Sequence, residues 1–257
     1  MSFLVILVAL LVERLTLWRL LVQRDQLWLE GLRRVERYAE CGRYLVCALF
    51  WMVLLPSSLC LGLLGLTHGL LNFALELLVL LYSLGRLEAW QRGDREAAFL
   101  CAERDLAVKA ESRSHLLTQV QAHLLSQAYH GFFAVIFWFS LFGATGALAY
   151  RLLSLLLEHS QQQNVRLQAA RLRHCIDWIP VRLLALSFVV LGNMASMGKA
   201  LRDNFTNKAL STEQFLLRVA QRDLDNSEGI EALHTLWQML VRSAVLWYAL
   251  LAAVVLL

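Results

Sequence analysis

Residues 132–143 read FFAVIFWFSLFG, an apolar run interrupted only by Ser140. A second run, LVCALFWMVLL, occupies residues 45–55. Neither run alternates polar and apolar residues, as the strands of a membrane β-barrel do. An α-helix instead crosses the hydrocarbon core with about 20 mostly apolar residues. These runs therefore predict an all-α integral membrane protein.

The composition agrees with this prediction over the whole chain of 257 residues, which has a mean hydropathy of +0.54. Hydrophobic residues make up 58% and charged residues 17%, whereas soluble domains contain roughly 45–50% and about 25%. We therefore expect a single membrane domain over residues 1–257. The net charge of +4 comes mostly from arginines beside the apolar segments, which indicates membrane topology rather than nucleic-acid binding.

The apolar runs predict a bundle of about five to six membrane segments. The first is the N-terminal stretch, which has no basic region before it and is expected to be retained. The other predicted segments are 43–64, 69–85, 131–157, 178–197 and 242–257. Polar segments 86–129 and 199–241 are predicted to form amphipathic helices at the cytoplasmic side, following the positive-inside rule.

Two local features refine this picture. Ser211 and Gln214 have the spacing of a capping box, which predicts a helix start after Ser211. Segment 131–157 either crosses the membrane once or turns back at residues 143–146, and we favour the single crossing. Gly143, Gly146 and Ala147 put small side chains at helical spacing, which predicts close helix packing there.

Ionisable residues inside apolar helices are costly and often functional. Glu76 lies within LNFALELLVLLY, with His68, Arg151 and Arg182 as candidate partners. We expect Asp177 to cap a helix whose first turn contains Pro180. We predict a polar pocket that binds an anionic ligand, or else serves only to anchor helices; its candidate residues are Glu76, Tyr150, Arg151, Asp177 and Arg182. The five cysteines show no zinc-site spacing, and no metal or other cofactor is predicted.

Two stretches carry a family resemblance, FWFSLFGATGALAYRLL at 137–153 and DWIPVRLLALSFVVLGN at 177–193. They resemble the AmpE family, inner-membrane proteins associated with β-lactamase induction in Gram-negative bacteria. They are more distantly similar to the adenosylcobinamide-phosphate synthases, whose superfamily includes AmpE. Tyr150-Arg151 and Pro180-Val181-Arg182-Leu183 match the motifs of those synthases.

The chain also departs from the synthase pattern. Where the synthases carry an acid-rich run, it has residues 126–130, SQAYH; where they carry an Asp-Asp pair, it has Arg173-His174. Paired carboxylates are what a magnesium–nucleotide site needs. The resemblance therefore implies a multi-pass regulatory protein of the bacterial inner membrane that responds to cell-wall status. ATP-dependent amide formation and a scaffold for a protein partner are the alternatives, and a cell-wall fragment is a candidate ligand.

Overall fold

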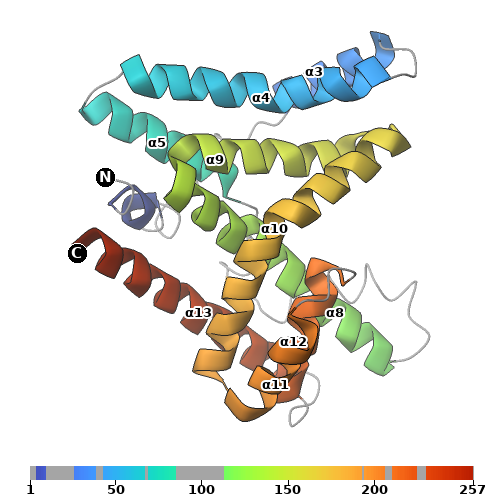
Figure 1. Cartoon of the computed structure of the whole chain (residues 1–257), viewed down its shortest axis with the longest axis vertical. Helices are drawn as coiled ribbons and strands as arrows, with labels where there is room; N and C mark the ends of the chain where they lie inside the picture. The colour runs from blue at the N-terminus through green and yellow to red at the C-terminus, as the bar shows by residue number, and fades with distance from the viewer. Residues whose placement is uncertain are drawn as a thin grey trace. The chain divides into compact units, whose positions relative to one another are not determined.

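A computed structural model describes most of the chain as helices (Figure 1). No strand occurs in the described residues, which are 4–9, 26–38, 43–66, 69–84, 113–192, 194–205, 210–224 and 230–256. The prediction of an all-α membrane protein is confirmed. The chain divides into two compact units; the first contains Met1–Leu84 and Ala134–Ile176, and the second contains Gly85–Phe133 and Asp177–Leu257.

The first unit packs three early helices with the middle of the chain. Its elements are α3 (Gln26–Tyr38), α4 (Arg43–Leu66), α5 (Leu70–Ser83), α9 (Ala134–His159) and the beginning of α10 (Gln163–Leu191). The predicted pair of helices at 43–64 and 69–85 is confirmed. Gly69 lies between them with φ of +69°, a left-handed conformation that glycine adopts without steric cost.

The core of this unit is built from the second half of α9. Leu152, Leu153, Leu155 and Leu156 are at most 3% exposed and form one cluster with residues of α3, α4 and α10. A polar contact closes the turn between α9 and α10, because the Glu36 carboxylate accepts hydrogen bonds from the Ser160 hydroxyl (2.6 Å) and the Gln161 amide (3.2 Å). Backbone N–H groups near a helix start need such acceptors.

Helix α9 turns sharply in its middle (Figure 1). Gly143 has φ of +64° and ψ of −154°, a combination that is essentially restricted to glycine. A Cβ atom on Gly146 would lie 2.6 Å from the Trp138 carbonyl oxygen. The small residues therefore let the two halves of α9 approach each other across the bend. The prediction that this stretch, with Ala147, serves helix packing remains a prediction.

The second unit combines amphipathic helices with two long apolar ones. Its elements are α8 (Arg113–Ala128), the π-helix η2 (Tyr129–Phe133), the end of α10, α11 (Met194–Asn204), α12 (Thr212–Leu224) and α13 (Ile230–Leu256). Leu216, Val219 and Ala220 of α12 are fully buried, as expected for one face of an amphipathic helix. The Gln214 amide donates to the Ser211 hydroxyl at 3.3 Å, so the predicted helix start after Ser211 is confirmed.

Two long helices extend beyond the membrane segments predicted within them. Helix α13 starts at Ile230, whereas the predicted membrane segment begins near residue 242, and α10 starts at Gln163 rather than near residue 178. The prediction that Asp177 caps a helix is therefore wrong, because Asp177 and Pro180 both lie inside α10. Residues 163–176 contain no glycine or proline, so nothing in this polar stretch interrupts the helix.

The membrane assignment rests on length and hydropathy. Within the described residues, three helical segments are long and apolar enough to cross a bilayer, namely Thr118–His159, Gln163–Leu191 and Glu231–Ala253. Two shorter apolar helical segments, Phe50–Gly65 and Leu70–Ser83, accompany them. The direction in which each segment crosses remains a prediction, and His68 and residues 86–112 lie outside the described residues.

Candidate functional site

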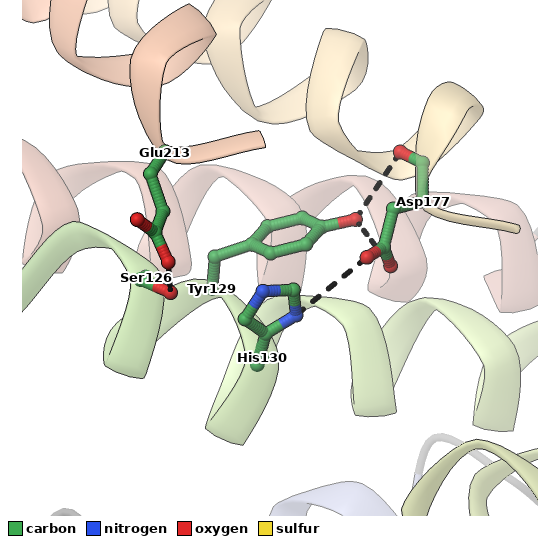
Figure 2. A network of polar contacts seen from close by, with 5 residues as sticks. All are labelled: Ser126, Tyr129, His130, Asp177 and Glu213. Atoms are coloured by element: carbon green, nitrogen blue, oxygen red, sulfur yellow. Dashed lines mark hydrogen bonds and ion pairs between the residues drawn. The ribbon is translucent and has the colours of Figure 1, made fainter. Parts of the chain in front are cut away.

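The second unit contains a buried polar cluster around Asp177, which we call the Asp177 cluster; its other members are Tyr129 and His130 (Figure 2). Asp177 is 2% exposed and Tyr129 is fully buried. The Tyr129 hydroxyl donates to the Asp177 Oδ1 atom at 3.1 Å and lies 3.3 Å from the backbone carbonyl oxygen of the same residue. The His130 Nδ1 atom lies 3.7 Å from Asp177 Oδ2, so both carboxylate oxygens face a polar side chain.

A π-helix explains how two consecutive residues reach one carboxylate. Successive side chains of an α-helix point about 100° apart. In η2 the backbone hydrogen bonds join residues i and i+5, so successive side chains are separated by a smaller angle than in an α-helix. Figure 2 shows Tyr129 and His130 directed toward the same side chain. Short π-helices inside α-helices are frequent at functional sites, and this one begins where the Asp177 cluster begins.

Further contacts connect this region to its neighbours in the second unit. One turn before η2, the Ser126 hydroxyl donates to Glu213 Oε1 at 2.8 Å, which ties α8 to the first turn of α12. At the other end of η2, the Phe133 and Trp247 rings meet edge to face with centroids 5.4 Å apart. The Trp247 indole N–H donates to the Ser187 hydroxyl at 2.8 Å, which joins α13 to α10. The π-helix is thus held at both ends.

Arg182 occupies a separate aromatic environment further along α10. It is 7% exposed, and its guanidinium carbon lies 4.2 Å from the Trp178 ring centroid. The rings of Phe205 and Phe215 are also within cation–π distance, at 5.4 and 5.2 Å. Its Nε donates to the Phe205 carbonyl oxygen at 2.8 Å, and its Nη1 donates to the Trp178 carbonyl oxygen at 3.0 Å. Cation–π contacts with a desolvated guanidinium are worth about 2 kcal/mol or more.

The predicted pocket residues are distributed over the two units. Glu76, Tyr150 and Arg151 belong to the first unit, whereas Asp177 and Arg182 belong to the second. Tyr150 is buried and Arg151 is half-buried. Asp177 and Arg182 share α10 but contact different groups, because the former faces η2 and the latter the aromatic rings. A pocket that contains all five residues remains a prediction.

Sequence reasoning did not select Tyr129 and His130 as site residues. The available signal was their position, because the predicted resemblance aligns residues 126–130 with the acid-rich run of the synthases. Three side chains of that segment, Ser126, Tyr129 and His130, contact the carboxylates of Glu213 and Asp177. Within the described part of the chain, no group of three or more His, Cys, Asp and Glu side chains could hold a metal ion.

Comparisons with known proteins show a partial similarity to a curated protein. The chain is 38% identical over 68 residues to the cobalamin biosynthesis protein CobD of Chromobacterium violaceum. The match covers 24% of this chain and 22% of the relative's length. No protein-family model matches the chain, and no solved structure matches it. Together with the apolar helices, this similarity indicates a membrane protein related in part of its length to a cobalamin biosynthesis protein.

Proposed function

We propose that this chain is a regulatory protein of the bacterial inner membrane, of the AmpE type, that influences β-lactamase induction in response to cell-wall status. The observation that supports the proposal is the Asp177 cluster. Ionisable groups inside membrane helices are rare and usually mark function. Here the carboxylate is engaged by the side chains of a π-helix, so a change in its contacts is transmitted directly to a second helix.

The contacts of the cluster suit a relay between helices. Asp177 joins α10 to η2, and Ser126 joins the preceding turn to α12 through Glu213. A ligand that competes for the Asp177 carboxylate would release Tyr129 and allow η2 to return to α-helical bonding. Such a two-state element is what a signal needs, because a ligand changes an equilibrium only through its different affinities for the two states.

Complementation in a Gram-negative host tests this proposal. The host carries an inducible β-lactamase and lacks its own AmpE-type gene, and hydrolysis of a chromogenic cephalosporin is measured before and after β-lactam exposure. We expect the chain to change the induction ratio, and Asp177→Asn to lose that effect at equal membrane abundance. The matched control is Glu158→Gln, which changes an exposed carboxylate. An induction ratio that is the same with and without the wild-type chain would reject the regulatory function.

The similarity to a cobalamin biosynthesis protein favours one alternative. In this alternative, the chain is an enzyme related to the adenosylcobinamide-phosphate synthases that uses ATP to drive the formation of an amide bond. This alternative expects magnesium–ATP to raise the thermal stability of the detergent-purified chain, because a ligand at a hundred times its dissociation constant adds about 2.7 kcal/mol. It also expects the chain to restore cobalamin-dependent growth to a strain without the synthase. Neither effect is expected of a purely regulatory protein.

A further inference from the structure

A hollow of about 610 Å³ lies between α11 and α12. Its size is within the range of about 300–1,000 Å³ that is usual for small-molecule sites. The polar side chains around it are Ser196, Lys199, Asp203, Asn204, Arg218 and Gln221. The hollow is formed within the second unit and by residues that neither the Asp177 cluster nor the Arg182 environment uses.

The two cations of the hollow, Lys199 and Arg218, have no carboxylate oxygen within 4.0 Å among the described residues. Their positive charges are therefore available to an anion. Arg218 is also oriented, because its Nη1 donates to the Asn204 Oδ1 atom at 3.2 Å. The Asn204 amide is itself fixed by a hydrogen bond from its Nδ2 atom to the Ala200 carbonyl oxygen at 2.8 Å. An oriented guanidinium beside an ammonium group is the arrangement that recognises phosphate oxygens.

The position of the hollow along the chain places it at a membrane boundary. Helix α11 follows the spanning candidate Gln163–Leu191 almost directly, and α12 precedes the spanning candidate Glu231–Ala253. The polar helices between two spanning segments must lie outside the hydrocarbon core. The positive-inside rule predicts that residues 199–241 lie on the cytoplasmic side, where basic pockets beside membrane helices bind the headgroups of anionic lipids.

We propose that the hollow binds a phosphate group that carries hydroxyl groups, supplied either by a glycerol-type phospholipid headgroup or by a soluble glycerol phosphate. Lys199 and Arg218 contact the phosphate oxygens. Asp203, which also lines the hollow, accepts a hydrogen bond from a hydroxyl group of the ligand. The Asp203 carboxylate repels the phosphate charge, whereas a hydroxyl group separated from the phosphate can donate to it while the phosphate contacts Lys199 and Arg218. The acidic residue therefore favours the hydroxylated ligand.

Calorimetric titration of the detergent-purified full chain tests the proposal. The probes are short-chain phosphatidylglycerol, glycerol 3-phosphate, inorganic phosphate and, as the zwitterionic control, short-chain phosphatidylcholine. We expect Lys199→Gln with Arg218→Gln to weaken binding by about tenfold or more, because charge-assisted hydrogen bonds are lost. The matched control is Arg202→Gln, which removes an exposed charge from the same helix outside the hollow and leaves the affinity unchanged.

The pattern of binding distinguishes the sources. Binding of phosphatidylglycerol alone assigns the hollow to a lipid headgroup, and equal binding of glycerol 3-phosphate assigns it to a soluble phosphate. In either case Asp203→Asn weakens the hydroxylated ligand and tightens inorganic phosphate. The proposal is overturned if neither glycerol ligand binds, if phosphatidylcholine binds equally well, or if Arg202→Gln weakens binding as much as the double variant does.

Discussion

Two carboxylates lie in apolar helices of this protein, Asp177 in α10 and Glu76 in α5, and their surroundings differ. Asp177 accepts a hydrogen bond from the buried Tyr129 hydroxyl and faces the His130 ring. The buried Oε2 atom of Glu76, in contrast, has no hydrogen-bond partner within the described residues. Both positions look alike in sequence, since each is an acidic residue close to long apolar runs.

The difference shows that acidic residues in membrane helices can contribute differently to stability, depending on whether a donor is present. Removing a buried acceptor leaves its donors without a partner, which costs about 1–3 kcal/mol. Where no protein donor contacts the carboxylate, replacing the acidic residue by a neutral one of similar shape should cost little stability. The two acidic positions should therefore differ in their response to mutation. Unfolding free energies measured by SDS titration in mixed micelles test this contrast.

The largest effect is expected from Arg182→Ala, which leaves a void between Trp178, Phe205 and Phe215. The variant loses the cation–π contacts and two hydrogen bonds, so the free energy of unfolding should fall by about 3 kcal/mol. The control on the same helix is Arg171→Ala, whose side chain is exposed. If the two variants lose equal amounts of unfolding free energy, the aromatic environment of Arg182 contributes nothing to stability.

Asp177→Leu should lower the free energy of unfolding by about 1–2 kcal/mol, because the buried Tyr129 hydroxyl loses its side-chain acceptor. Asp177→Asn keeps one side-chain oxygen and should lose about half as much. If Asp177→Leu is as stable as the wild type, the Asp177 cluster is not held together in the folded protein, and its role as a relay fails with it.

Tyr129→Phe removes only the hydroxyl and should cost about 1 kcal/mol, in line with hydrogen bonds measured between membrane helices. A double-mutant cycle with Asp177→Asn isolates the interaction between the two side chains. We expect a coupling energy of about 0.6–1.7 kcal/mol. Strict additivity of the two single changes would mean that the 3.1 Å contact contributes no stability.

Glu76→Gln should have the smallest effect, because we expect it to change the free energy of unfolding by less than about 0.5 kcal/mol in either direction. The comparison between the two carboxylates predicts that even Glu76→Leu retains the wild-type stability. A loss similar to that of Asp177→Leu would show that Glu76 is bound by a group outside the described residues, and the contrast would disappear.

Part of the site was predictable and part was not. Asp177 and Arg182 were selected because charged residues in apolar helices are costly wherever they lie. Their partners could not be selected, because Tyr129 is distant from Asp177 in the sequence and a π-helix has no reliable sequence signature. The predicted cap at Asp177 failed for another reason, since no glycine or proline in residues 163–176 interrupts the helix before Asp177.

The amino-acid sequence by itself determined the class of this protein, because long apolar runs satisfy their backbone only as helices in a bilayer. It also determined the α4–α5 turn and the start of α12, which depend on glycine and serine at particular positions. Only the tertiary structure decided where α10 and α13 begin, how α9 bends at Gly143, and which groups surround Asp177 and Arg182. The surroundings of Asp177 and Arg182 arise from contacts between residues far apart in the chain. A periodic apolar pattern predicts which face of a helix is buried, but it does not predict which helix packs against that face.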